Sequence, residues 1–172
     1  IQNVNKDVDP TRDIEIIETE ILLSDLESLQ KRLEKNNKKK LERKELIFLD
    51  ECLKLINDGK KPDKLKKKFS KNLIKKSGLL SLKPRIIVCN VDEKSLPDGN
   101  KYSSACKKKF TNENIIIICA DIEDQIMNLR VKDRKDFMFE SGIKSTGLNN
   151  LIKVGYRTLG LRTFFTSGPE ES

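Results

Sequence analysis

The chain has 172 residues, a mass of 19.8 kDa and a formal net charge of +8, which is length enough for one domain or two small ones. It contains no histidine, and this excludes Ser-His-Asp and Cys-His catalytic arrangements, histidine-ligated zinc and an imidazole pH switch within these residues. With no tryptophan and two tyrosines, the chain is also poorly supplied with stacking platforms for single-stranded nucleic acid.

The positive charge is concentrated in one segment. Residues 31–76 carry 18 basic and 7 acidic side chains, whereas residues 1–30 carry 2 basic and 8 acidic ones. A concentrated positive field favours polyanionic partners, chiefly nucleic acid, through neutralisation of phosphates and release of counterions. The same lysines are equally compatible with a solvated surface that contacts nothing.

Cysteine spacing and hydropathy indicate the cellular compartment. No two of the four cysteines (Cys52, Cys89, Cys106 and Cys119) have the spacing C-x-x-C, so we expect free thiols, no disulfides and a cytoplasmic location. No stretch of 18 apolar residues occurs, so we expect no membrane partner. The first residue is Ile1 rather than methionine, and we therefore expect a piece of a longer protein.

Helical periodicity dominates the first half of the chain. Asp9 and Pro10 are a capping residue and a first-turn proline, and isoleucines and leucines at three- and four-residue steps predict a helix over residues 10–33. After a polar turn, a second apolar stripe predicts a helix that ends at Gly59, so the two form an antiparallel hairpin. A third, lysine-rich helix is expected over residues 64–76.

The helical spacing of apolar residues then gives way to short, continuous runs of β-branched residues. Residues 84–90 and 115–120 each read as a fully buried strand of a parallel sheet with helices on both faces. With an intervening helix over residues 102–110 they form one β-loop-α-β unit. The downstream pattern predicts further elements: helices over 124–129, 132–140 and 148–159, with Gly142 as a stop, the start of a strand over 161–166, and a turn at 167–169.

Polar segments follow both predicted strands. Asn90-Val91-Asp92-Glu93 follows the first and Cys119-Ala120-Asp121-Ile122 ends the second. Ligands of open α/β sheets sit at the carboxyl ends of strands, so these segments can face one ligand. An Asn carboxamide can donate to purine N7 and accept from an exocyclic amine, and the amides of Ala120 and Asp121 can donate further. Asn90 as the cap of a turn is the simpler alternative.

The first of these segments departs from the guanine-reading sequence N-K-x-D of P-loop GTPases. Glu93 stands in the place of the aspartate and is one methylene longer, and Val91 stands in the place of the lysine. A displaced carboxylate forfeits a bidentate contact worth roughly 1–3 kcal/mol by analogy with base-edge recognition. Relaxed or adenine-leaning selectivity is therefore the hypothesis.

These residues resemble those of the YchF family, the Obg-like ATPases of the P-loop GTPase superfamily, over nearly the whole chain. The segments that carry the resemblance are spread widely and occur in the family's order: Val8 to Glu15, Asp25-Leu26-Glu27, Leu82-Lys83-Pro84, Asn90 to Glu93, Ile118-Cys119-Ala120, Ile122-Glu123, Gly155-Tyr156, Leu159-Gly160-Leu161 and Phe164 to Glu170.

The resemblance implies an α/β fold made of the C-terminal part of a P-loop G domain, an inserted antiparallel coiled-coil hairpin and the start of a TGS domain. The implied boundaries are 1–13 (G domain), 14–80 (coiled-coil insertion), 81–158 (G domain) and 159–172 (truncated TGS domain). It further implies a base-binding site for ATP or GTP, with ATP usually preferred, and a cytosolic protein linked to the ribosome. The implied base-binding residues are Asn90, Val91, Glu93, Ala120 and Asp121.

The family's phosphate-binding loop, Gly-x-Pro-Asn-Val-Gly-Lys-Ser, does not occur in this sequence, and neither does its magnesium-binding threonine. We expect both upstream of Ile1, and we expect no catalytic residue within the chain and no hydrolysis by the chain alone. Three hypotheses stay open: part of an ATP- or GTP-hydrolysing protein that uses Mg²⁺, a bare GTPase in which Glu93 acts as the aspartate, and a non-enzymatic RNA- or ribosome-binding module. The lysines assigned to RNA contact are Lys38, Lys39, Lys40, Lys66, Lys67 and Lys68.

Overall fold

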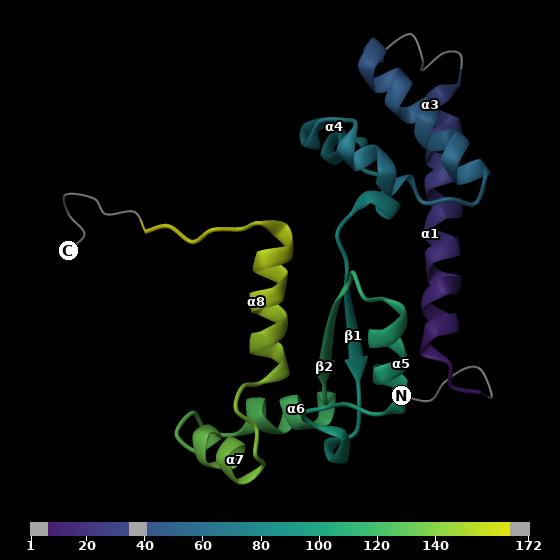
Figure 1. Ribbon diagram of the computed structural model, residues 1–172. Helices are drawn as coiled ribbons and strands as arrows, with labels where there is room; N and C mark the ends of the chain where they lie inside the picture. Colours follow the sequence, from purple (N-terminus) through teal and green to yellow (C-terminus); the bar gives the residue numbers. More distant parts are fainter. Residues whose placement is uncertain (1–6, 35–40, 166–172) are drawn as a thin grey trace, which may run out of the picture. The chain divides into compact units, whose positions relative to one another are not determined.

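The computed structural model describes residues 7–34 and 41–165, and the chain divides into two compact units, Ile1–Lys83 and Pro84–Ser172. The first unit is helical, and the second contains a small parallel sheet with its helices (Figure 1). Each unit is described by itself.

The first unit is built on the predicted helical hairpin. Helix α1 spans Pro10–Leu33, and the Asp9 carboxylate caps it by accepting from the amides of Thr11 and Arg12, both at 3.1 Å. Helix α3 spans Arg43–Asn57 and packs against α1, and the chain reverses direction between them (Figure 1). Both helices therefore confirm the sequence prediction, to within the usual uncertainty of helix ends.

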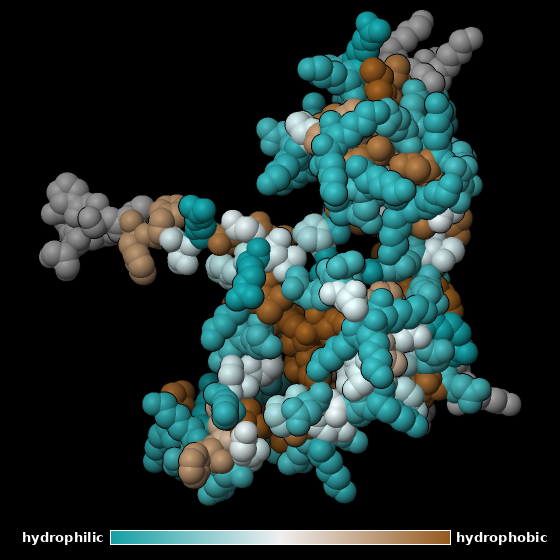
Figure 2. All heavy atoms as spheres, viewed as in Figure 1, coloured by the Kyte–Doolittle hydropathy of each residue, from teal (hydrophilic) through white to brown (hydrophobic). Residues whose placement is uncertain are grey.

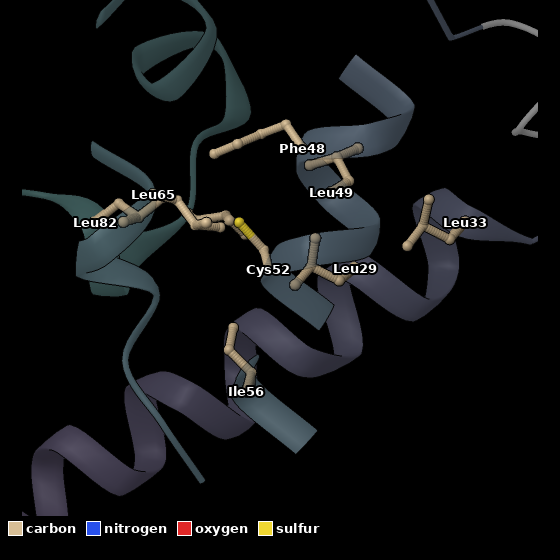
Figure 3. Packing of buried hydrophobic residues seen from close by; sticks show 9 residues of the cluster. Leu29, Leu33, Phe48, Leu49, Cys52, Ile56, Leu65 and Leu82 are labelled. Carbon is tan, nitrogen blue, oxygen red and sulfur yellow. The ribbon is translucent and has the colours of Figure 1, made fainter. Parts of the chain in front are cut away.

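A hydrophobic cluster of described residues holds this unit together (Figure 3). Phe48 and Phe69 meet edge to face with ring centroids 5.0 Å apart, a favoured aromatic geometry. Leu29, Phe48, Leu49 and Cys52 have no exposed surface. The buried members of the cluster are Leu29, Leu33, Phe48, Leu49, Cys52, Ile56, Leu65, Leu79 and Leu82.

The predicted third helix over residues 64–76 is wrong as one continuous element. The structure has a 3₁₀ helix η1 (Pro62–Lys67), a break, and then helix α4 (Lys71–Ser77). Ser70 causes the break, because its hydroxyl caps the new helix by accepting from the Leu73 amide at 3.3 Å. Gly78 then ends α4 in the left-handed conformation, with φ of 72°.

The buried carboxylate of Asp25 joins α1 to the last element of this unit. It accepts from the backbone amides of Leu80 and Ser81, both at 2.8 Å, at the start of the short 3₁₀ helix η2 (Leu80–Leu82). Asp25 is only 3% exposed. This contact fixes the segment that leads out of the helical unit.

The second unit contains the predicted strand-loop-helix-strand arrangement. Strands β1 (Ile86–Asn90) and β2 (Asn114–Ile118) pair in parallel with Val88 opposite Ile116. Between them lie the 3₁₀ helix η3 (Glu93–Ser95) and helix α5 (Lys101–Lys109), which begins with a capping box between Asn100 and Ser103.

Helices flank β2 on its two faces. Helix α5 and helix α8 (Gly147–Leu159) both pack against β2. The Ile117 side chain lies beside Gly99, just before α5, whereas the Ile118 side chain lies beside Gly147, the first residue of α8. Because neighbouring residues of a strand point to opposite faces, the predicted two-sided covering is confirmed for β2.

Three details of this unit differ from the prediction. Strand β1 is not fully buried, since Val88 is 41% exposed. Strand β2 stops at Ile118, because helix α6 (Ala120–Asn128) begins two residues later. Residues 161–165 form no strand, since Phe164 and Phe165 are exposed and have no strand to pair with among the described residues. The predicted turn at 167–169 lies outside the described residues.

The remaining predicted helices are present. Helix α7 spans Arg134–Glu140, and Gly142 follows it with φ of 68°. A second, smaller cluster packs α6 and α7 together around Cys119, Ile122 and Ile126. Helix α6 is therefore anchored immediately behind its first turn, which is where the candidate site lies.

Candidate functional site

The ends of β1 and β2 bring the two predicted segments together. The Asn90 Oδ1 accepts from the Ala120 amide at 3.0 Å, and the Val91 amide donates to the Ile118 carbonyl at 2.8 Å. In the parallel register Asn90 lies opposite Ile118, so Val91 is the first residue beyond β1 and its amide reaches the Ile118 carbonyl. Asn90, Val91 and Ala120 therefore form one small constellation at the carboxyl edge of the sheet.

The geometry gives Ala120 a different partner from the one the sequence suggested. Its amide was expected to donate to a ligand, but it donates to Asn90. The acceptor half of the Asn90 carboxamide is thereby used, and the Nδ2 group, which has no acceptor among the described residues, is its available donor. The contact fixes the orientation of the carboxamide plane at the edge of the sheet.

The first turn of α6 supplies further donors. Cys119 is the N-cap but makes no side-chain capping bond, so the amides of Asp121 and Ile122 have no partner within the helix. The Glu123 amide, in contrast, donates to the Cys119 carbonyl at 3.0 Å. Asp121 therefore offers a backbone donor beside Asn90, and its side chain is exposed.

Solvent reaches most of this constellation. Asn90, Glu93, Ala120 and Asp121 are exposed, and only Val91 is buried, at 8% exposure. Glu93 is the first residue of η3 and borders a pocket of about 570 Å³. This pocket runs along β2 past Leu96 on one side and Thr146 on the other. Figure 2 shows brown, apolar surface in this region, next to α8.

A carboxylate behind the site ties α8 to α6. The Gly147 amide donates to Glu123 Oε1 at 2.5 Å, and the Thr146 hydroxyl caps the same helix by accepting from the Asn149 amide at 3.1 Å. A Cβ at position 147 would lie 2.6 Å from Ile118 Cγ2. Sequence reasoning missed this contact: Thr146 and Gly147 were readable as a helix start, but nothing in the sequence pairs them with Glu123.

The lysines predicted to contact RNA fall into three groups. Lys38, Lys39 and Lys40 lie outside the described residues. Lys66 pairs with Asp63 at 2.6 Å and Lys68 with Glu51 at 2.5 Å. Lys67 is exposed and has no carboxylate partner within the described part of the chain.

The structure also bears on metals, membranes and thiols. In residues 7–34 and 41–165 no group of three His, Cys, Asp or Glu residues is arranged to hold a metal ion. None of the described helices is long and apolar enough to cross a membrane. Cys52, Cys89, Cys106 and Cys119 are free thiols.

The parallel strands, the flanking helices and the meeting of the two strand ends define the chain as an α/β fold of the P-loop GTPase class. A solved YchF GTPase from Schizosaccharomyces pombe superposes with a TM-score of 0.78 and 27% identity over 98% of this chain and 49% of that one. The resemblance to the YchF family is confirmed by curated relatives that match 99% of the chain.

These relatives are called ribosome-binding ATPase YchF. The protein of Bacillus subtilis is 35% identical, that of Escherichia coli O157:H7 33% and that of Mycoplasma genitalium 32%. No family model matches the chain. The chain spans about half the length of the curated relatives it matches, with 50% of the Bacillus subtilis protein covered.

Proposed function

We propose that the chain supplies the base-recognition part of a YchF-type nucleotide-binding protein that hydrolyses ATP or GTP and associates with the ribosome. The observation that carries this proposal is the Asn90–Ala120 hydrogen bond of 3.0 Å, which joins the ends of the two strands into one site. The names of the relatives, which are ribosome-binding ATPases and a GTPase, supply the reaction and the partner.

The chemistry of the site fits a purine base. With its oxygen held by Ala120, Asn90 donates from Nδ2, and purine N7 is an acceptor of suitable direction. The Asp121 amide is a second donor, and the exposed Glu93 carboxylate is an acceptor for exocyclic or ring N–H groups. Val91 is buried and its amide donates to the Ile118 carbonyl at 2.8 Å, so its proposed role is to hold the turn that follows Asn90.

Phosphoryl transfer is assigned to the longer protein of which this chain would be a part. The sequence contains no phosphate-binding loop, and the described residues offer no ligand set for Mg²⁺. We therefore derive no step through the metal, and the proposed role of Asn90, Val91, Glu93, Ala120 and Asp121 is binding alone. A cytoplasmic location follows from association with the ribosome.

The domain division is part of the same proposal. Residues 1–13 and 81–158 would belong to the nucleotide-binding domain, residues 14–80 to a coiled-coil insertion and residues 159–172 to the start of a TGS domain. The packing of α1 against α3 supports the insertion as a helical arm.

A titration of the ¹⁵N-labelled chain with ATP and with GTP, followed by amide chemical shifts, tests base recognition directly. We expect the amides of Glu93, Ala120 and Asp121 to shift with at least one nucleotide. Asn90→Ala should abolish these shifts, whereas Asn72→Ala, which removes an exposed Asn of α4, should leave them intact. Shifts that are absent with both nucleotides, or unchanged in Asn90→Ala, would contradict the proposal.

A second candidate function is a non-enzymatic RNA- or ribosome-binding module. The observation that favours it is the run of exposed lysines in η1 and α4. RNA binding without any nucleotide-dependent shift would support this function in place of the first. The two roles are compatible within one longer protein.

A further inference from the structure

One edge of strand β2 is paired and the other is open. Among the described residues, β2 pairs with β1 alone, in parallel. The Ile118 carbonyl accepts from the Val91 amide at 2.8 Å, so Ile118 directs its backbone groups towards β1. Because successive residues of a strand direct these groups to opposite edges, Ile116 also faces β1, whereas Ile115 and Ile117 face the open edge.

The backbone groups at the open edge have no partner in the described part of the chain. No hydrogen bond joins the amide or the carbonyl of Ile115 or Ile117 to another described residue on that side. Each of these residues thus presents one donor and one acceptor, at the spacing that an added strand would match. An exposed row of this kind is a template for pairing with another polypeptide.

This open edge borders a hollow in the surface. Residues 115–118 all border the pocket of about 570 Å³. Since their side chains alternate between the two faces of the sheet, the feature that all four share is the backbone edge, which must face the hollow. Leu96 and Pro97 border it on one side, and Thr146 and Asn150 on the other. We call this hollow the edge groove; its walls suit a single extended chain better than the edge of a second folded sheet.

Lysines give the edge groove a positive rim. Lys107 and Lys144 border it, are exposed and have no carboxylate partner among residues 7–34 and 41–165. Two carboxylates also border it: Glu123 accepts from the Gly147 amide, and Glu93 lies at the carboxyl edge of the sheet, in the candidate site. Two lysines therefore stand against one carboxylate that is not engaged by the fold, which favours a partner with acidic side chains.

We propose that the edge groove binds an extended, acidic and apolar peptide segment of another protein as an additional strand on β2. Backbone hydrogen bonds to Ile115 and Ile117 supply affinity for an extended chain, and the walls of the groove select its side chains. The apolar wall takes apolar side chains, and Lys107 takes an acidic one. This inference goes beyond the proposed function, because Asn90 and Ala120 do not border the groove.

An alternating peptide probes the groove directly. The probe is an acetylated peptide of about eight residues in which valine alternates with glutamate, which is long enough to form a typical strand. One control peptide has the same side chains with every backbone nitrogen methylated, so it cannot donate hydrogen bonds to β2. A second control has lysine in place of glutamate. The full ¹⁵N-labelled chain is titrated with each peptide, and amide hydrogen exchange is followed residue by residue.

We expect an alternating pattern of protection along β2. In the free chain the amides of Ile115 and Ile117 should exchange readily, whereas those of Ile116 and Ile118 are protected by their pairing with β1. The valine-glutamate peptide should slow exchange at Ile115 and Ile117 and leave the other two unchanged. Both control peptides should bind more weakly, by about fivefold or more.

Two charge reversals on α5 separate binding in the groove from a general effect of charge. Lys107→Glu changes a lysine that borders the groove, and Lys108→Glu changes its exposed neighbour, which does not. Lys107→Glu should weaken binding of the valine-glutamate peptide about fivefold, and Lys108→Glu should leave it nearly unchanged. Thermal melting by circular dichroism checks that both variants fold.

Three outcomes of these titrations would overturn the inference: no slowing at Ile115 and Ile117 with about 1 mM peptide, equal binding of either control peptide, or equal losses in the two charge reversals. Protection of the same two amides in the free chain that rises with chain concentration would also overturn it, because a second copy would then occupy the groove.

Discussion

Asp25 and Leu80 are 55 residues apart in the sequence and are joined by a hydrogen bond of 2.8 Å from the Leu80 amide to the Asp25 carboxylate. The second carboxylate oxygen accepts from the Ser81 amide at the same distance. A side chain of helix α1 thus accepts hydrogen bonds from two backbone amides of a distant turn, at the edge of the hydrophobic cluster.

The first prediction concerns this carboxylate. Asp25→Ala should lower the free energy of unfolding of the helical unit by about 3 kcal/mol, since two charge-assisted hydrogen bonds are lost from a nearly buried site. Asp25→Asn keeps one acceptor and should cost less. Urea denaturation followed by circular dichroism gives the stability, and hydrogen exchange at Leu80 and Ser81 gives the local effect.

The control is Glu27→Ala, two residues further along α1, where the side chain is exposed. It should change the free energy of unfolding by no more than about 0.5 kcal/mol. Equal effects at positions 25 and 27 would show that the Asp25 contacts carry no stability.

The second prediction compares two glycines of α8, Gly147 at its first position and Gly155 in its middle. Gly147→Ala should destabilise the sheet-containing unit by roughly 1–3 kcal/mol, because the new Cβ would lie 2.6 Å from Ile118 Cγ2 and 3.0 Å from Glu123 Oε1. Gly155→Ala, in the middle of the helix with nothing within 4 Å, should stabilise it by about 0.5–1 kcal/mol. Thermal unfolding monitored by near-ultraviolet circular dichroism of Tyr102 and Tyr156 measures both, and the same sign for both variants would refute the packing argument.

The third prediction concerns the Cys52 thiol. Burial, followed by the nearby Asp25 and Glu51 carboxylates, raises the pKa of Cys52 from 9.0 to about 12. The folded state therefore holds this proton more tightly than the unfolded state, and its contribution to stability is complete below pH 9 and lost as the pH rises towards about 12. Cys52→Ala should weaken this decline of stability with pH, as measured by urea denaturation at pH 8 to 11.

The same raised pKa predicts how the thiols react. Alkylation requires the thiolate, so iodoacetamide at pH 8 should leave Cys52 unmodified in the folded chain. Cys89 is only half-buried and should react sooner, although burial raises its pKa as well. Peptide mass mapping after timed alkylation gives the order, and early modification of Cys52 would contradict the burial seen here.

The fourth prediction addresses the base. If Glu93 reads the N–H edge of a purine, Glu93→Asp should shift the ratio of GTP to ATP affinity towards GTP, because the shorter side chain restores the carboxylate position of the N-K-x-D sequence. A change of roughly tenfold corresponds to the lower part of the 1–3 kcal/mol range of a bidentate contact. Competition of the two nucleotides in the shift titration measures it, and an unchanged ratio would remove Glu93 from the base site.

Sequence reasoning found the elements whose signal is local. The Asp9–Pro10 start of α1, the β-branched runs of β1 and β2 and the polar residues that follow them are all legible from periodicity and capping. It failed where a tertiary contact decides. Ser70 divides the lysine-rich helix, and Phe69 beside it packs on Phe48; the pattern of lysines and leucines carries no trace of that ring contact.

For the candidate site, the sequence predicted which segments meet but not which atoms are bonded. The parallel register follows from two buried runs joined by a helix, and it brings Asn90 beside Ala120. Which atom of Asn90 would be occupied, and by which amide, depends on the turn after Ile118 and could not be read. Likewise, the lysines chosen from the charge run included Lys66 and Lys68, whose partners Asp63 and Glu51 come from neighbouring structure.

Helix α6 is tethered twice within its first four residues: Ala120 is bonded to the end of β1, and Glu123 is bonded to the start of α8. The start of α8 and the end of β1 are therefore joined through the first turn of α6, by the Glu123 carboxylate and the Ala120 amide. The last helix of this unit and the polar edge of its sheet thus share the first turn of α6 as a common anchor.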